Sequence, residues 1–468
     1  MEYELELCDS EEFEINGGTW FITLPKVCRL IIDTPIFQRL RRIKQNGITD
    51  LVYPDATHSR FVHSLATASL AYDFMNVLQR KYPKCVTKTD ILCVTIAALV
   101  HDLGHGPFSH LFEEIFKSGF CHEEISGKLF MKIINDYTAV RKGLLQLKDA
   151  EFALIQQLIN PPSFENIDIE WPLLVPRHKA FLFAIVSNPL NGLDVDKLEY
   201  LMRDSSHSGV RICFDKEMVS RLINSVKICK HKDYNISWVS FYGTHGEDVH
   251  SVFSSRKRLY QVVYNHRFIL IASEMMKKAL RLAAPYLLFK GSNGKMIPLN
   301  QCSNDLDAYI KLDDSIYSFI RYSPLPEMEE AQKLLEQLEM RQIPKIIAKL
   351  DEIPLGKCSK TLKSQIEKIL KNESFASFES NDIYTITKSF NGGKGDCDPL
   401  PYVLFYPRTD SSQTCTFNGD SVKSKHCIFV YASNKTSEED AKKIFQLLME
   451  FSKEAGIGEP KNMFKIQL

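Results

Sequence analysis

The segment Leu92-Cys-Val-Thr-Ile-Ala-Ala-Leu-Val-His-Asp-Leu-Gly-His-Gly-Pro-Phe-Ser-His110 decides the fold of this chain. It begins as an apolar run rich in alanine and leucine, which predicts a buried helix. The run ends on His101 and Asp102, and two glycines and a proline at 104–107 then break the helix. Because an ionised aspartate at the end of a core helix needs a cation or hydrogen-bond donors, this pattern indicates a metal centre.

The composition bounds the class of protein. The 468 residues, 44% hydrophobic and 25% charged, fit a soluble globular protein of one large domain or two to three smaller ones. Fifty-eight basic and 58 acidic residues cancel, which gives no global electrostatic case for nucleic acid or an anionic membrane. The 12 cysteines form no Cys-x-x-Cys pair, so free thiols in a reducing compartment are expected.

Targeting signals are absent from the sequence pattern. The N-terminus lacks the basic start and apolar core of a signal peptide, and the longest apolar run, residues 91–100, is too short to span a bilayer. We expect no membrane association. The cytoplasm is the default location, and the nucleus stays an alternative although no segment marks a nuclear address.

Hydrophobic periodicity predicts a mainly α-helical chain with a smaller α+β C-terminal lobe. Helices are expected over 25–47, 63–82, 109–117, 122–137, 151–159, 181–187 with its continuation through 191–204, 215–230, 248–287, 306–321, 327–341 and 437–453. Strands are expected over 234–238, 382–388, 401–406 and 427–431. The loop Asn391-Gly-Gly-Lys-Gly-Asp396 lacks the spacing of a phosphate loop and predicts only a mobile turn.

A second segment, residues 191–204, carries several ionisable side chains. Asp196, Tyr200, Arg203 and Asp204 can share roughly one side of a helix, with Lys197 beside Asp196. One interpretation is a salt-bridged helix on the protein surface without a catalytic or binding role. The alternative is the wall of an active site.

The histidines and acids of these segments form a chemically plausible set. His63, at a helix start, could join His101, Asp102 and Asp196 as two imidazoles and two carboxylates, a mixed set that suits Fe, Mn or Zn and leaves positions for water and substrate. Such a metal lowers the pKa of bound water and polarises a phosphoryl oxygen. Further groups suit acid–base work or polyphosphate binding, namely His105, His110 and His122 for the first and Arg60, Lys197 and Arg256 for the second.

The order of His63, His101-Asp102 and a later aspartate is the usual order of an HD-type phosphohydrolase. The motifs at 101–110 and 191–204 resemble those of the eukaryotic HD-domain deoxynucleoside triphosphate triphosphohydrolase family, whose members often carry a preceding SAM domain. Residues 31–45, 58–63 and 256–267 are similar as well, and the resemblance weakens after about residue 340. This chain begins where the family's catalytic core begins, so we expect no SAM domain.

The resemblance implies a role for each matched residue. It implies His63, His101, Asp102 and Asp196 as metal ligands, His105 and His122 as catalytic histidines with His110 beside them, and Arg60, Lys197 and Arg256 as phosphate-binding residues. It further implies that Gln45 and Asp204 recognise the sugar 3′-hydroxyl, that Tyr200 packs under the deoxyribose, and that Tyr264 forms another wall of the pocket. The possible activator-nucleotide site comprises Asp33, Arg41, His266 and Arg267.

The activity implied by the resemblance is hydrolysis of dNTPs at the α-phosphorus to deoxynucleoside and inorganic triphosphate, which lowers dNTP pools. Mg²⁺ would accompany the substrate triphosphate, GTP or a dNTP could act as activator, and a homodimer or homotetramer is expected. The expected division is a catalytic HD domain over 1–290 and an α+β lobe over 291–468 with an assembly role. Pool control, antiviral restriction and a viral countermeasure fit equally well.

Two departures from the family pattern affect these expectations. Asn46 stands where the family has leucine, so sugar or base contacts differ there. The family's Asp-Pro-x-His-Gly loop is replaced by Gly17-Gly-Thr-Trp-Phe21, and Tyr242-Gly-Thr244 replaces a basic pair. Both of these changes put activation by nucleotide-driven tetramerisation in question.

Two rival hypotheses remain. One is a nucleic-acid-binding or interaction protein that keeps the HD fold, with residues 39–44 and 256–267 as the only candidate basic patches. The other is an HD phosphodiesterase or 5′-nucleotidase acting on other nucleotides. Three separated phosphate-binding cations favour a longer phosphate chain over a monophosphate.

Overall fold

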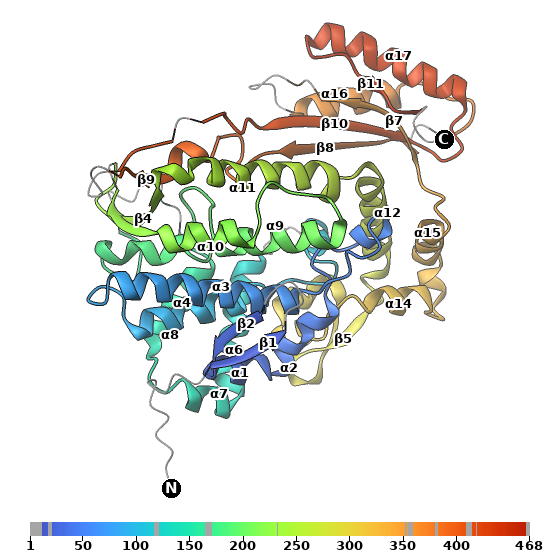
Figure 1. The fold of residues 1–468 in the computed structure, drawn as a ribbon. Helices are drawn as coiled ribbons and strands as arrows, with labels where there is room; N and C mark the ends of the chain where they lie inside the picture. The colour runs from blue at the N-terminus through green and yellow to red at the C-terminus, as the bar shows by residue number, and fades with distance from the viewer. Residues whose placement is uncertain are drawn as a thin grey trace.

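The computed structural model describes residues 12–16, 21–116, 121–162, 164, 171–231, 233–351, 353, 359–379, 382–408, 414–417 and 419–464. A mainly helical body carries a four-stranded sheet with two helices at its C-terminal end (Figure 1). The predicted fold class, mainly α with a smaller α+β C-terminal lobe, is confirmed. No helix within the described ranges is long and apolar enough to cross a bilayer.

The helical body is built from fifteen labelled α-helices in the described part of the chain. They are α1 (Val27–Ile32), α2 (Pro35–Gln38), α3 (Arg60–Lys81), α4 (Lys88–Val100), α5 (His110–Ile115), α6 (His122–Asp136), α7 (Thr138–Gly143), α8 (Asp149–Ile159), α9 (Val195–Ser208), α10 (Lys216–Ser225), α11 (Gly246–Leu259), α12 (Arg267–Ala283), α13 (Leu306–Tyr309), α14 (Ile316–Arg321) and α15 (Glu329–Glu339).

Small sheets flank this body. β1 (Glu12–Asn16) pairs antiparallel with β2 (Phe21–Pro25), and β5 (Leu288–Lys290) pairs antiparallel with β6 (Met296–Pro298). β3 (Lys227–Lys230) pairs with β4 (Ser237–Tyr242), and β4 pairs in parallel with β9 (Leu404–Tyr406) from the C-terminal region. The parallel pair joins the C-terminal region to the body through backbone hydrogen bonds.

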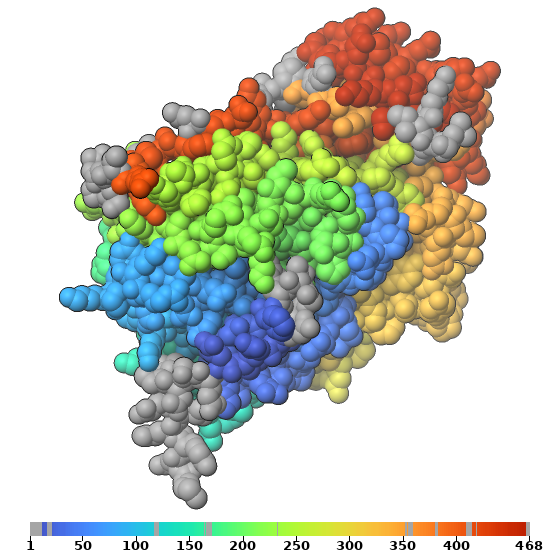
Figure 2. All heavy atoms as spheres, viewed as in Figure 1, coloured from blue at the N-terminus to red at the C-terminus, as the bar shows by residue number. Residues whose placement is uncertain are grey.

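The C-terminal sheet has the order β11-β7-β10-β8, with all neighbours antiparallel. Its elements are β7 (Lys345–Leu350), α16 (Ser359–Lys371), β8 (Tyr384–Phe390), β10 (Lys425–Ala432), α17 (Glu438–Ala455) and β11 (Lys461–Asn462). One face packs against α16 and α17, and the other packs Ile386 and Phe429 against Leu270 and Ile271 of α12. The C-terminal residues therefore lie on the surface formed by α11 and α12 (Figure 2).

Helix α4 forms the centre of the body. Thr87 caps its first turn, since its hydroxyl accepts from the Asp90 amide while the Asp90 carboxylate accepts from the Thr87 amide. Residues 90–100 are all buried, between α3, α8 and α6. Such a helix, apolar on every side, fits only in a core, as the sequence predicts.

The turn after α4 is held by close backbone contacts. A Cβ on Gly104 would lie 2.0 Å from the His122 carbonyl oxygen, so only glycine lets the start of α6 approach this closely. Phe108 and Ser109 both have a φ of 59°, a left-handed conformation that costs about 1–3 kcal/mol per residue. The surrounding structure holds this strain at the turn that carries the predicted catalytic histidines.

Arg39 ties this turn to the rest of the body. The side chain is 1% exposed, and its Nη2 donates to the Leu103 carbonyl at 2.6 Å and to the His105 carbonyl at 2.9 Å. Its Nη1 donates to the Leu312 carbonyl at 2.7 Å. Burial lowers the pKa of Arg39, and the guanidinium lies over the Tyr309 ring. A residue expected on a basic surface is thus an internal anchor.

Several expected elements differ from the structure. The long helix over 248–287 is two helices, α11 and α12, separated by a π turn at Tyr260–Tyr264. It is interrupted because the Tyr264 hydroxyl reaches Asp204 and the His266 ring then caps α12 through the Phe268 amide. Residues 227–230 are strand β3 and not helix, since their backbone groups pair with β4.

Other expectations need a smaller correction or stay open. The apolar segment near 181–187 is a 3₁₀ helix, Arg177–Ala184, and 306–321 is two short helices. β7 and α16 were not predicted at all. The main apolar core runs through residues 299–338 and 400–422, so the division at residue 290 stays a prediction. Most of the altered loop at 17–21 lies outside the described residues.

Replacing Arg39 with methionine tests its anchoring role. Arg39→Met leaves three buried carbonyls without a donor, each worth about 1–3 kcal/mol, so we expect a loss of about 3 kcal/mol or more in the free energy of unfolding. Urea denaturation measures it. Arg29→Met is the control, since Arg29 is exposed and, among the described residues, its side chain makes only a 3.5 Å ion pair with Asp33. Equal midpoints for both variants would contradict the role of Arg39.

Candidate active site

Four predicted metal ligands come together from three parts of the chain. His63 lies in the first turn of α3, His101 and Asp102 directly follow α4, and Asp196 lies in the first turn of α9. His63 Nε2 lies 3.1 Å from Asp196 Oδ1 and 3.4 Å from Asp102 Oδ2. His101 Nε2 lies 3.4 Å from Asp102 Oδ1 and 3.5 Å from Asp196 Oδ1.

The two histidines are oriented as metal ligands require. His63 Nδ1 lies 2.5 Å from Glu199 Oε2, and His101 Nδ1 lies 2.7 Å from the Ala98 carbonyl oxygen. Both contacts suit a protonated Nδ1, which leaves a lone pair on each Nε2. Each Nε2 is buried and has no hydrogen-bond partner among the described residues. With Asp196, these atoms lie within 4.8 Å of one another, so the residues fit a divalent metal.

Glu199 is a functional residue that the sequence prediction missed. It is fully buried in α9, three residues after Asp196, and its second carboxylate oxygen accepts from Arg203 Nε at 2.6 Å. Arg203 therefore turns away from the cleft, although helical spacing placed it on the same side as Asp196. An acidic residue at i+3 from a proposed ligand is the signal that could have revealed Glu199.

The buried Asp102 carboxylate is kept ionised by its neighbours. Its Oδ2 accepts from Arg60 Nη1 at 2.5 Å, and its Oδ1 lies 3.3 Å from His105 Nε2. Burial alone would raise the pKa of Asp102, but Arg60, His101 and His105 hold it well below its usual range. Asp102 thus carries a full negative charge at neutral pH beside the two metal-binding histidines.

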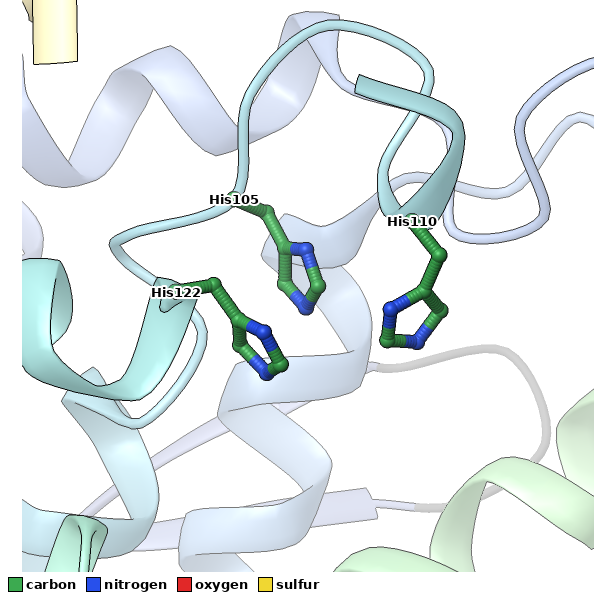
Figure 3. A group of neighbouring side chains, drawn as sticks. All are labelled: His105, His110 and His122. Carbon is green, nitrogen blue, oxygen red and sulfur yellow. The ribbon is translucent and has the colours of Figure 1, made fainter. Parts of the chain in front are cut away.

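Three histidines, His105, His110 and His122, bring their rings close together (Figure 3). The rings of His105 and His122 stack with centroids 4.0 Å apart, and His110 meets them edge-on at 4.9 and 5.5 Å. Glu113 Oε2 lies 3.1 Å from His122 Nδ1 and 3.4 Å from His110 Nδ1. One carboxylate therefore fixes two imidazoles.

The protonation of this cluster follows from its surroundings. Burial, together with Arg60 and His122, holds the pKa of His105 well below its usual range. Burial would raise the pKa of Glu113, but hydrogen bonds from His110 and His122 lower it below its usual range. His105 is therefore neutral at pH 7, and Glu113 is an anion beside the other two rings.

Asp204 forms the opposite end of the site. Its Oδ1 accepts from Asn46 Nδ2 at 2.8 Å and lies 2.7 Å from His58 Nε2, while its Oδ2 accepts from the Tyr264 hydroxyl at 2.5 Å. Burial would raise the pKa of Asp204, but these hydrogen bonds lower it. Gln45 Oε1 is buried nearby without a partner in the described part of the chain. His58 and Asn46 were not predicted as site residues.

The three predicted phosphate-binding cations occupy separate points of the site. Arg60 pairs with Asp102, as described, and Lys197 Nζ lies 3.1 Å from Asp194 Oδ2. Arg256 Nη1 donates to the Asn391 carbonyl at 2.8 Å, in the C-terminal region. Arg60 also donates through Nε to Ser109 Oγ at 2.8 Å and through Nη2 to the Gln45 carbonyl at 3.3 Å, so it is held more tightly than Lys197 and Arg256.

A cleft of about 870 Å³ unites these groups. Its lining includes every predicted catalytic and substrate-binding residue and three of the four predicted metal ligands, while His63 lies buried behind the wall. Ile386 and Lys388 of β8 line it as well, and Lys388 lies 3.5 Å from Glu114 of α5. The predicted residues are brought together, whereas their individual roles stay predictions.

The predicted activator residues do not form one site within the described chain. Asp33 is exposed and paired with Arg29, while Arg41 lies over the Phe61 ring. His266 caps α12, and neither hydrogen bond nor ion pair joins it or Arg267 to the other two in the described residues. These residues stay a prediction for an assembled form.

The two basic segments of the rival nucleic-acid hypothesis each lose one cation. Arg39 is an internal anchor, and Arg256 faces the cleft. Arg41, Arg42 and Arg258 are exposed, and Arg258 Nε donates to the Arg211 carbonyl. The hypothesis of a nucleic-acid-binding surface therefore stays open, with fewer cations to support it.

Comparison with known proteins identifies similar chains. Residues 60–160 match the HD domain family. The chain is 34% identical to the deoxynucleoside triphosphate triphosphohydrolase SAMHD1 of Gallus gallus, over 84% of this chain and 66% of that protein. It is 32% identical to the Homo sapiens SAMHD1, over 81% and 62%, and 31% identical to the SAMHD1 homolog of Dictyostelium discoideum, over 82% and 69%. The chain thus spans slightly less than two thirds of the Gallus gallus and Homo sapiens proteins.

Replacing Glu199 with glutamine tests its support of His63. Glu199→Gln removes the charge that fixes the His63 ring and balances Arg203, so we expect metal affinity to fall about 10–100-fold. Metal content is measured after equilibration in metal buffers. The exposed Glu217 of α10 supplies the control, Glu217→Gln. Identical metal content in the two variants would show that Glu199 does not support the site.

Proposed function

Since this chain belongs to the family of the deoxynucleoside triphosphate triphosphohydrolase SAMHD1, we propose that it is a metal-dependent phosphohydrolase that acts on dNTPs. The proposed reaction is hydrolysis at the α-phosphorus, with deoxynucleoside and inorganic triphosphate as products. Its consequence in a cell would be a lower dNTP pool. The observation that carries the proposal is the convergence of a His/His/Asp/Asp cluster, three cations and Asp204 in one cleft.

The cluster would hold a divalent ion through His63, His101, Asp102 and Asp196. When bound there, such an ion activates water and polarises a phosphoryl oxygen. Fe, Mn or Zn suits this donor set, and Mg²⁺ would accompany the substrate triphosphate. The chain supplies the orientation, since Glu199 and Ala98 fix both imidazoles.

The residues around the α-phosphorus would bind the phosphate and protonate the leaving group. Hydrolysis breaks the bond between the α-phosphorus and O5′ and forms one to a water oxygen. The leaving O5′ needs a proton, and His110 and His122 are candidates to donate it because Glu113 holds both rings in the cleft. His105, which is neutral and buried, would position the phosphate by a hydrogen bond.

The residues at the opposite end of the cleft would recognise the sugar. Asp204 would accept a hydrogen bond from the 3′-hydroxyl, and Gln45 would donate one to it. Asn46 and Tyr264 hold the Asp204 carboxylate. Tyr200 lines the cleft between this end and Lys197. Its ring would pack under the deoxyribose and leave little room for a 2′-hydroxyl.

Assembly and activation form a finer part of the proposal. A homodimer or homotetramer would bring Asp33 and Arg41 toward a second chain, with GTP or a dNTP as activator. His266 and Arg267 would serve a second nucleotide. The separation of these pairs within one chain supports an assembled site.

Product analysis tests the reaction. Purified protein with each dNTP and each NTP, with Mg²⁺ or Mn²⁺ and with or without GTP, is expected to release deoxynucleoside and inorganic triphosphate from dNTPs. In ¹⁸O-labelled water, the label is expected in triphosphate because the bond from phosphorus to O5′ breaks. Asp102→Asn is expected to lower turnover at least about 100-fold, since it removes the charge shared by Arg60 and two histidines.

The alternatives give different results in the same experiment. Release of orthophosphate from deoxynucleoside monophosphates would indicate a 5′-nucleotidase, and cleavage of phosphodiesters would indicate a phosphodiesterase. Turnover that needs GTP would support the activator site. Absence of turnover under every condition, with metal bound, would refute the proposed function.

Sugar selectivity tests the role of Tyr200. Tyr200→Ala removes the ring and opens space at C2′, so we expect the ratio of kcat/KM for dGTP to that for GTP to fall about 10-fold. Tyr200→Phe keeps the ring and is expected to keep the ratio. Steady-state kinetics with both nucleotides measures it. An unchanged ratio in Tyr200→Ala would exclude a steric gate at this position.

A further inference from the structure

The glycine-rich segment Phe390–Cys397 of the C-terminal lobe lies against the cleft of the helical body. It begins at the last residue of β8 and precedes the segment that leads into β9, which pairs with β4 of the body. The sequence predicts a mobile turn here, yet the structure places the segment beside two of the three cations of the site. We call it the glycine loop.

Asn391 of the glycine loop holds the Arg256 guanidinium. Arg256 Nη1 donates to the Asn391 carbonyl oxygen at 2.8 Å and to its side-chain Oδ1 at 2.9 Å. The guanidinium also lies 4.0 Å above the Tyr260 ring centroid. With one nitrogen fixed and one ring beneath it, the plane of the guanidinium is set before any ligand arrives.

The same guanidinium has one N–H donor that no described residue accepts. Arg256 Nε is buried and has no hydrogen-bond partner in the described residues, while the side chain lines the cleft. A buried N–H without a partner costs about 1–3 kcal/mol. An oxygen of an anionic ligand in the cleft would satisfy it with a charge-assisted hydrogen bond.

Gly393 lies beside both cations. Its φ is +116°, and a Cβ placed on it would lie 3.4 Å from Arg256 Cδ, Arg256 Nε and Lys197 Cε. A side chain at this position would therefore stand between the two cations. The absence of one leaves that space for a ligand.

The glycine loop is anchored to the turn that precedes α9. Lys394 Nζ donates to the Leu190 carbonyl at 2.6 Å and lies 4.4 Å from the Tyr402 ring centroid. Asn191 Nδ2 donates to the Tyr402 carbonyl at 3.2 Å. These contacts fix the loop relative to Lys197, which lies in the first turn of α9.

We propose that the glycine loop completes the binding site for the far end of a triphosphate, with Asn391 positioning Arg256 and Gly393 keeping the space between Arg256 and Lys197 open. The loop thereby selects a triphosphate over a shorter phosphate chain. This inference rests on the proposed function and deepens it. Asn391 is a positioning residue, because it acts through Arg256.

Two glycine variants form a matched pair. Gly393→Ala fills the space between the cations, whereas Gly395→Ala changes a glycine of the same loop with a φ of +55° and no atom within 4 Å of its Cβ position. Both carry a cost for alanine at positive φ, and that cost is larger at +116° than at +55°, so the difference between them is read together with Asn391→Ala. Asn391→Ala tests the hold on Arg256 separately.

Binding of inorganic tripolyphosphate and pyrophosphate to metal-loaded full-length protein is measured by calorimetry with Mg²⁺ present. We expect Gly393→Ala and Asn391→Ala to weaken tripolyphosphate binding about 10-fold and pyrophosphate binding less, as expected for losing one charge-assisted contact. Gly395→Ala is expected to bind both as the unchanged chain does. In turnover assays, the first two variants should raise KM for dNTPs with kcat changed less.

The possible results distinguish the inference about the glycine loop from the proposed function. Equal tripolyphosphate binding by all variants, or equal weakening by both glycine variants, would overturn the inference. Weaker binding by Gly393→Ala and Asn391→Ala without any dNTP turnover by the unchanged chain would support the loop and refute the proposed function. Normal dNTP turnover with an unchanged KM in Gly393→Ala and Asn391→Ala would support the proposed function and overturn the role of the glycine loop.

Discussion

The ionised Asp102 carboxylate at the end of a buried helix is the constraint on which the site depends. A carboxylate in this position is stable only if donors or cations surround it. Arg60, His101 and His105 provide them, and each is itself held by another part of the fold. The strained turn at Phe108 and Ser109, the close approach at Gly104 and the Arg39 anchor all serve to keep these groups around one charge.

The contacts of the predicted metal-binding and catalytic histidines with neighbouring groups determine which ring nitrogens are available for binding. Glu199 and the Ala98 carbonyl hold the inner nitrogens of two histidines, so the outer nitrogens face one point with lone pairs available. Glu113 does the same for His110 and His122. The two histidine clusters therefore differ in how carboxylates hold them: Glu199 holds one ring of the first, and Glu113 holds two rings of the second.

The sequence predicted which residues meet in space better than it predicted the boundaries of the helices and strands around them. The order of His63, His101-Asp102 and Asp196 identified residues that meet in space, and helical spacing placed Tyr200 and Asp204 in the same cleft. Glu199, His58 and Glu113 escaped because their partners are distant in sequence or ordinary in type. The π turn at Tyr260–Tyr264 escaped because its cause, the contact between Tyr264 and Asp204, spans 60 residues. The strand β3 followed a helical pattern, and only its partner β4 determined its conformation.

The two ends of the cleft depend on different parts of the chain. All four predicted metal ligands lie between residues 63 and 196, within the helical body. Arg256, in contrast, is held by Asn391, and the cleft wall includes Ile386 and Lys388 of the C-terminal sheet. The predicted metal ligands therefore depend on contacts within the helical body, such as that of His63 with Glu199, whereas the predicted phosphate-binding end also depends on the C-terminal sheet. Because that sheet packs on α12 through an apolar contact at Leu270 and Ile271, this packing sets the position of the cleft wall that the sheet supplies.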